Sequence, residues 1–144
     1  MQTNILLLIH LGLTLYMTGV IWFVQVVHYP LMGSVGRDQF VAYENRHTVL
    51  TTIVVAFPMI IEALTALLLT FTVDSNKSLW WANLILVGIL WGSTFFLQVP
   101  QHGILSQAFD EVAHQKLVST NWVRTIAWTI RAGLVLYLVS FYLK

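Results

Sequence analysis

Three histidines stand at the ends of long apolar runs in this chain of 144 residues. His28 ends the first run, His47 begins the second and His102 follows the third. If these runs cross a membrane, all three histidines lie at one level. Neutral imidazole is a ligand of zinc, copper and iron, and three histidines that leave an open position form a known catalytic arrangement. Interfacial histidines also hydrogen-bond headgroups or loop carbonyls, but the pattern favours a ligand or substrate that at least two of these three share.

Two Glu-x-x-His units add carboxylates to this set, at Glu44–His47 and Glu111–His114. Residues three apart share a helix face, and di-iron carboxylate bundles combine two such units with two further glutamates. No further glutamates occur at a matching level, and His114 is expected in a loop without a role. Solvated charge pairs are therefore favoured over a dinuclear site, and Glu44 is the glutamate expected among the metal ligands.

A third group, Asn121–Trp–Val–Arg124–Thr125, opens the fourth apolar run. An arginine at this depth commonly extends to the lipid phosphates. Alternatively, Arg124 and Asn121 point into the same pocket as the histidines, where the guanidinium binds an anionic or phenolate oxygen. The sequence leaves both alternatives open.

Two opposite charges lie deep in the apolar runs. Glu62 follows His47 by roughly 22 Å of helix, and Arg131 follows Val118 by roughly 20 Å, at a rise of about 1.5 Å per residue. The matching depths predict a buried Glu62–Arg131 ion pair, whose simplest role is to fix the helix register.

Three other residues are placed by the same counting of depth. Pro58 is expected to kink the second span and to free a backbone carbonyl nearby, at a level where Tyr16 can hydrogen-bond. His10 is expected near the opposite surface and is given no role.

The elements that must position these residues are four apolar runs, at about 4–27, 47–73, 79–99 and 118–143. Hydrophobic residues make up 58% of the chain and charged residues 9%, far from the balance of soluble proteins. Each run is long enough to cross roughly 30 Å of hydrocarbon as a helix. The sequence therefore predicts an all-α, integral-membrane four-helix bundle that forms one domain over residues 1–144 and has the lipid bilayer as a partner.

The arrangement of the loops predicts a duplicated helical hairpin. Gln25 lines up with Gln98, and Pro30 falls near Pro100. The long connections, 29–46 and 101–117, lie on the side opposite the short one at 74–78. Asp38 is expected to cap a helix that runs straight into the second span, and a separate interfacial helix is expected over 106–116.

Other features of the composition limit the possible functions. The chain has no cysteine, which excludes thiolate metal ligands, and a net charge of +1 without a basic run gives no sign of nucleic-acid binding. The spacing of Gly88 and Gly92 favours close helix packing within the bundle or a homo-oligomer. The first run lacks a signal-peptide pattern and is expected to be retained.

The distribution of basic residues predicts the orientation. The long-loop side carries Arg37, Arg46, Lys116 and Arg124, whereas the opposite side carries only Lys77 and Lys144. Because basic residues are in excess on the cytoplasmic side of membrane proteins, the long loops are expected in the cytoplasm, most simply that of a bacterium with the protein in its inner membrane.

Two motifs carry a family resemblance that covers most of the chain. Val99–Pro100–Gln–His102–Gly–Ile–Leu105 and Asn121–Trp–Val–Arg124–Thr125 resemble motifs of the small four-span membrane family that includes anthrone oxygenases. That resemblance implies oxygenation of a reduced polycyclic phenol without an added organic cofactor. The chain departs from the family at two positions, since His102 replaces the usual asparagine and Trp122 the usual histidine. With these departures the pocket still contains a histidine, but the group that it holds is expected to change to a metal or a haem.

The leading hypothesis is an integral-membrane oxidoreductase or oxygenase-like enzyme. Its pocket at the long-loop side would take a hydrophobic aromatic or quinone-like molecule from the lipid, with His47 or His28 as base or metal ligand and Arg124 stabilising an oxyanion. A metal would be copper, iron or zinc. The alternatives are a b-type haem protein of electron transfer with two histidines as axial ligands, and a small transporter or structural homo-oligomer. The proposed pocket residues are His28, His47, His102, Asn121 and Arg124, with Glu44 as an additional metal ligand.

Overall fold

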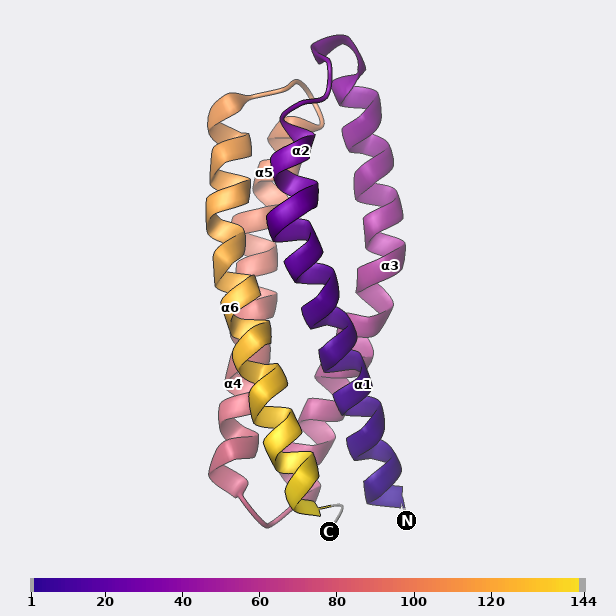
Figure 1. Ribbon diagram of the computed structural model, residues 1–144, viewed down its shortest axis with the longest axis vertical. Helices are drawn as coiled ribbons and strands as arrows, with labels where there is room; N and C mark the ends of the chain where they lie inside the picture. Colours follow the sequence, from indigo (N-terminus) through magenta and orange to yellow (C-terminus); the bar gives the residue numbers. More distant parts are fainter. Residues whose placement is uncertain (1, 143–144) are drawn as a thin grey trace.

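Four long helical segments lie side by side and form an up-and-down bundle (Figure 1). The computed structural model describes residues 2–142, so the predicted end of the fourth span at Leu143 and the charge of Lys144 lie outside the described residues. The predicted all-α fold is confirmed. The elements are α1 (Gln2–Phe23), η1 (Val24–His28), α2 (Tyr29–Met32), α3 (Arg37–Thr72), α4 (Lys77–Ser93), η2 (Thr94–Gln98), α5 (Val99–Leu105) and α6 (Glu111–Tyr142).

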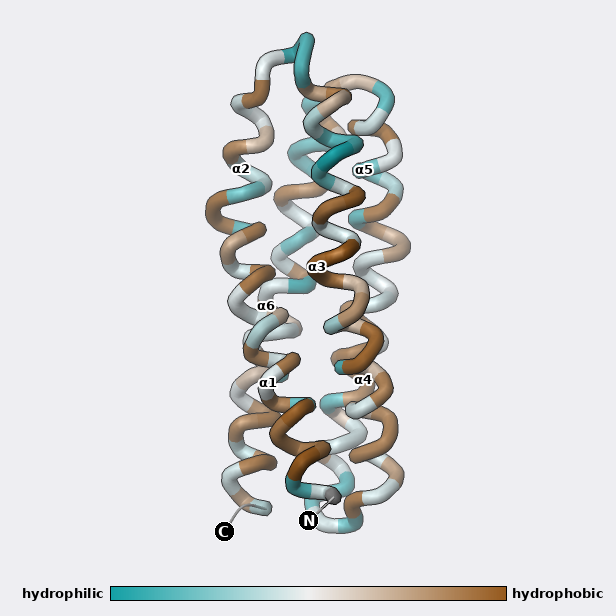
Figure 2. Tube along the Cα trace, turned by 90° about the vertical axis from the view of Figure 1, so that its right-hand side faces the viewer, coloured by the Kyte–Doolittle hydropathy of each residue, from teal (hydrophilic) through white to brown (hydrophobic). Residues whose placement is uncertain are grey.

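The bundle has the outer surface of a membrane protein. Its four spans, Thr3–Met32, Arg37–Thr72, Lys77–Leu105 and Glu111–Tyr142, are each long and apolar enough to cross a bilayer. Large apolar side chains point outward, as at Phe57, which is 70% exposed, and Phe96, which is 80% exposed. Hydrophilic residues gather toward the end with the long connections (Figure 2). Because lipid is the solvent for such surfaces, backbone groups are satisfied within helices.

Helix starts differ from the predicted span limits because loop residues extend the helices. As expected, α3 continues unbroken into the second span, but Asp38 is not its cap: Gly36 is the N-cap residue, no side chain caps this end, and Asp38 lies in the first turn. The predicted interfacial helix over 106–116 is wrong, because a turn follows Leu105 and α6 begins at Glu111. The Asp110 carboxylate accepts the N–H of Ala113 at 2.7 Å, so this side chain caps α6 and sets its start.

Each of the two proline-bearing exits contains a π-helical turn. The turn Val24–His28 precedes Pro30, and the turn Thr94–Gln98 precedes Pro100 at the same spacing. Proline lacks an N–H and its ring clashes with the carbonyl four residues earlier, and a widened turn relieves both conflicts. The two hairpins therefore correspond in local structure.

This correspondence changes the predicted alignment of the repeat. Matching the prolines pairs His28 with Gln98, whereas the sequence alignment paired Gln25 with Gln98. Both glutamines are nevertheless buried and bind α6: Gln25 donates to the Val118 carbonyl at 3.2 Å, and Gln98 donates to Thr120 Oγ1 at 3.1 Å.

Two predictions about helix packing have different outcomes. Pro58 removes the usual donor to the Val54 carbonyl, and the Tyr16 hydroxyl donates to that carbonyl at 3.5 Å, as expected from the sequence. Close intrabundle packing at Gly88 and Gly92 is wrong. A Cβ added at either glycine would meet nothing within 4 Å, so no neighbouring helix approaches there.

Candidate functional site

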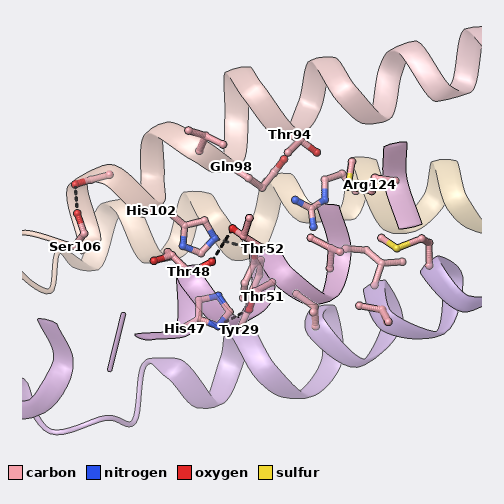
Figure 3. Close-up of a pocket in the computed structure, with 18 of the residues that line it drawn as sticks. Tyr29, His47, Thr48, Thr51, Thr52, Thr94, Gln98, His102, Ser106 and Arg124 are labelled. Carbon is pink, nitrogen blue, oxygen red and sulfur yellow. Dashed lines mark hydrogen bonds between the residues drawn. The ribbon is translucent and has the colours of Figure 1, made fainter. Parts of the chain in front are cut away.

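A cavity of about 430 Å³ opens in the half of the bundle nearer the long connections (Figure 3). This volume falls within the roughly 300–1,000 Å³ range of small-molecule sites. Apolar side chains of α1 form one wall, and a threonine-rich face of α3 forms another. The η2–α5 segment and α6 complete the lining, which includes Met17, Val20, Ile21, Tyr29, His47, Thr48, Thr51, Thr52, Gln98, His102 and Arg124.

Glu44, His47 and His102 come together at this cavity. One potential ligand atom from each lies within 4.8 Å of the others. The Glu-x-x-His spacing puts Glu44 and His47 on one face of α3, and the η2 turn carries His102 in from the third span. His102 Nδ1 donates to Glu44 Oε1 at 2.6 Å. Two helices from different hairpins thus bring one carboxylate and two imidazoles together.

The Glu44 carboxylate is fully buried and only half satisfied. Its relative exposure is 0%, and its Oε2 atom has no hydrogen-bond partner among residues 2–142. A buried carboxylate oxygen without a donor costs free energy unless a cation or donor meets it. The arrangement therefore suits a cation at the free oxygen.

His28 joins this group through His47. Its Nε2 atom is hydrogen-bonded to His47 Nδ1 at 2.9 Å, and Thr51 Oγ1 lies 3.0 Å from the same His47 atom. A second cavity of about 200 Å³ adjoins His28 and His47, with Phe23, Leu50 and Val54 in its wall. These three apolar side chains are exposed on the lipid-facing side of the bundle. The predicted convergence of His28, His47 and His102 is confirmed in this geometry.

Tyr29 is a site residue that sequence reasoning missed. Its buried hydroxyl is hydrogen-bonded to His102 Nε2 at 3.1 Å and lies beside the Arg124 guanidinium. Because His102 Nδ1 donates to Glu44, its Nε2 accepts from the Tyr29 hydroxyl. The position directly before Pro30 was the available signal, since a tyrosine there is held rigidly at the helix exit.

Asn121 does not line the cavity, although the sequence interpretation placed it there with Arg124. It is fully buried against η1, where its Nδ2 donates to Gln25 Oε1 at 2.9 Å. Thr125 also donates to Gln25 Oε1, at 3.4 Å. Asn121 and Arg124 are about one helical turn apart, and Arg124 reaches the cavity whereas Asn121 packs against the η1 turn. Its role is to hold the η1 turn against α6.

His114 is not in a loop, as the sequence interpretation expected, but buried on α6. Its Nε2 donates to the Tyr29 carbonyl at 2.8 Å. The N–H of Gly33, which would bond that carbonyl in a continuing helix, goes to Pro30 instead. His114 therefore satisfies a helix end and helps to position Tyr29.

We expect Gly33→Ala to destabilise this arrangement. A Cβ at Gly33 would lie 2.8 Å from His114 Cε1, and the imidazole cannot retreat without losing the Tyr29 carbonyl. Such overpacking typically costs about 1–3 kcal/mol of unfolding free energy. Thermal unfolding in detergent measures this loss. Gly12→Ala is the matched control, because its Cβ meets nothing within 4 Å and a helical glycine costs about 0.5–1 kcal/mol relative to alanine. Equal melting temperatures for the two variants would contradict the packing argument.

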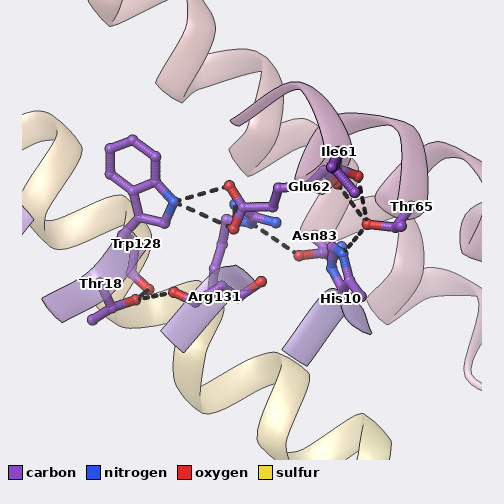
Figure 4. Close-up of polar contacts among 9 residues, drawn as sticks. His10, Thr18, Ile61, Glu62, Thr65, Asn83, Trp128 and Arg131 are labelled. Carbon is purple, nitrogen blue, oxygen red and sulfur yellow. Dashed lines mark hydrogen bonds and ion pairs between the residues drawn. The ribbon is translucent and has the colours of Figure 1, made fainter. Parts of the chain in front are cut away.

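A second set of buried polar side chains lies farther from the long connections than the cavity does, between the two apolar clusters of the core. Figure 4 shows its contacts. The predicted ion pair is confirmed, with Arg131 Nη1 2.8 Å from Glu62 Oε1. Trp128 Nε1 donates to Glu62 Oε2 at 3.1 Å, and Arg131 Nε donates to Asn83 Oδ1 at 3.0 Å. This polar layer ties α3, α4 and α6 together.

His10 extends the polar layer to α1, whereas the sequence interpretation gave it no role. It is 0% exposed. Asn83 Nδ2 donates to His10 Nε2 at 3.2 Å, so His10 Nδ1 donates to Thr65 Oγ1 at 2.8 Å. All four spans thus contribute a side chain to one hydrogen-bonded layer.

Comparison with known proteins adds no assignment to this geometry. No family model, curated protein or solved structure matches the chain.

Proposed function

We propose that this protein is an integral-membrane oxidoreductase or oxygenase-like protein that binds a transition-metal ion beside a hydrophobic small molecule. The observation that carries the proposal is the convergence of Glu44, His47 and His102 within 4.8 Å, beside the cavity that the two histidines line. The resemblance to the family that includes anthrone oxygenases supports the oxygenase-like part.

The donor set fits a first-row transition metal. Two imidazoles and one carboxylate are ligands that iron, copper and zinc accept, and this combination leaves coordination positions open. The unpartnered Oε2 atom of Glu44 is the free donor that such an ion would use. When bound, the ion would supply Lewis-acid or redox chemistry at the cavity wall. His28, bonded to His47, orients that imidazole.

The geometry favours a single ion over a haem. Axial imidazoles bind iron from opposite faces of the macrocycle, so the ring must pass between them. His28 and His47 are hydrogen-bonded to each other at 2.9 Å, which leaves no room for a macrocycle between them. His102 Nδ1 donates to Glu44, so His102 would bind a metal through Nε2, in place of the hydrogen bond from the Tyr29 hydroxyl.

The hydrophobic molecule is inferred from the walls and the access route. Met17, Val20 and Ile21 supply an apolar wall, which would hold an aromatic or quinone-like body. The smaller cavity at His28 and His47 adjoins side chains that face lipid, so a membrane-dissolved molecule can approach the site laterally.

The test is elemental analysis and an absorption spectrum of the wild-type protein, purified in mild detergent without a histidine tag. We expect iron, copper or zinc at a constant ratio to protein after gel filtration, and no haem Soret band. Absence of all three metals, both as purified and after incubation with each ion followed by desalting, would overturn the metal-dependent proposal. A Soret band would favour the b-type haem alternative instead.

We also infer that the long connections face the cytoplasm of a bacterial inner membrane, on the excess of basic residues at that end. The chain has no cysteine, so a single cysteine introduced at Ser34 or Gln107 would be the protein's only target for a membrane-impermeant thiol reagent. Its labelling shows on which side of the membrane that residue lies. Protection in intact cells and labelling after permeabilisation are expected. Labelling in intact cells would reverse the orientation.

A further inference from the structure

Two arginines lie on the same face of α6, Arg131 fully buried and Arg124 half-buried, and only Arg131 has an anionic partner among the described residues. Arg124 and Arg131 are separated by two helical turns. Arg131 is paired with Glu62 at 2.8 Å. Arg124 forms no ion pair among the residues that the structure describes, and its Nε atom is buried without a hydrogen-bond partner.

The surroundings of Arg124 offer no internal carboxylate. Its neighbours are the Tyr29 hydroxyl and the Trp128 ring, whose centroid is 5.9 Å from the guanidinium carbon. Of the two buried glutamates, Glu62 binds Arg131 and Trp128, and Glu44 binds His102 through Oε1 and forms no ion pair with Arg124. A cation–π contact offsets only part of the desolvation of a guanidinium.

The free side of Arg124 faces the cavity. Figure 3 shows its guanidinium directed into the space that His47 and His102 line further along. A charge held at an apolar, low-dielectric wall attracts an opposite charge far more strongly than it would in water. We therefore expect the molecule that occupies the cavity to carry the anion that pairs with Arg124.

We propose that the cavity binds an apolar monocarboxylate, with its carboxylate on Arg124 and its hydrocarbon body along the α1 wall. A carboxylate matches the planar fork of a guanidinium with two parallel hydrogen bonds. Met17, Val20 and Ile21 provide the apolar surface for the hydrocarbon body. The inference rests on the part of the proposed function that places a hydrophobic molecule in this cavity, but it does not depend on a metal.

The experiment titrates purified protein in nanodiscs of neutral lipid with dodecanoate, with dodecan-1-ol of equal chain length, and with 4-nonylphenol. Intrinsic tryptophan fluorescence and calorimetry report binding. We expect dodecanoate to bind at least about tenfold more tightly than the alcohol, the difference that a charge-assisted hydrogen bond supplies. Arg124→Gln should remove this preference while leaving binding of the alcohol unchanged.

Arg46→Gln is the matched control, because it removes an exposed cation from the same end of the bundle. It should retain the preference for dodecanoate. Equal affinity for dodecanoate and dodecan-1-ol in the wild type would overturn the proposal even if Arg124→Gln failed to fold. Tighter binding of 4-nonylphenol than of dodecanoate would also overturn it, by assigning a phenol to the site. Retained metal with no carboxylate preference would leave the proposed function standing and remove this inference alone.

Discussion

Replacing Glu62 with glutamine is expected to lower the free energy of unfolding by about 3–5 kcal/mol, the usual result of removing one partner from a buried ion pair. Arg131 is 0% exposed and its only carboxylate partner within the described chain is Glu62. The variant leaves a guanidinium uncompensated between two apolar clusters, in a layer to which all four spans contribute. Thermal or denaturant unfolding in one defined detergent measures the loss.

Two comparisons separate this charge effect from general damage. The double variant Glu62→Gln with Arg131→Gln removes both charges while keeping amide donors and acceptors, so it should be more stable than Glu62→Gln alone. Glu111→Gln removes an exposed glutamate whose partner Arg37 lies 3.7 Å away, and surface pairs contribute only about 0–1 kcal/mol. If Glu62→Gln and Glu111→Gln lose the same stability, the ion pair does not stabilise the bundle.

Helix number and the deep ion pair were predictable because both depend on distance along a helix. Four runs of sufficient length give four spans, and counting residues from two reference points put Glu62 and Arg131 at one depth. His10 was given no role because depth was counted without regard to helix face. It lies on the stripe Leu7, His10, Thr14, Met17 and Ile21, all buried, whose spacing of three and four residues marks the inward side of α1.

The local geometry of the site was less accessible to sequence reasoning. The convergence of the histidines was predictable, because the ends of adjacent spans share one level of the membrane. The π-helical turns were not, because hydropathy carries no signal for one extra residue in a turn. Each such turn rotates the residues beyond it by about 100° relative to a regular helix. That rotation sets the directions of Tyr29 and His102, whose side chains are in contact.

Replacing Glu44 with glutamine is expected to weaken transition-metal binding by at least about 10–100-fold, the loss that even outer-shell changes produce at metal sites. The substitution preserves side-chain volume but removes the only carboxylate of the three-residue group. An amide oxygen is a weaker ligand for iron, copper or zinc than a carboxylate. Competition with a chelator of known affinity, read by elemental analysis after desalting, gives the change directly.

The second Glu-x-x-His unit supplies a matched control for this variant. Glu111 has the same spacing to His114 as Glu44 has to His47, yet it is exposed at the start of α6 and contacts Arg37. Glu111→Gln should therefore retain the wild-type metal content. His114 already donates to the Tyr29 carbonyl and cannot offer that nitrogen to an ion. Equal metal affinity in the wild type and Glu44→Gln would show that the ion binds elsewhere, whereas loss in both variants would show that binding follows surface charge.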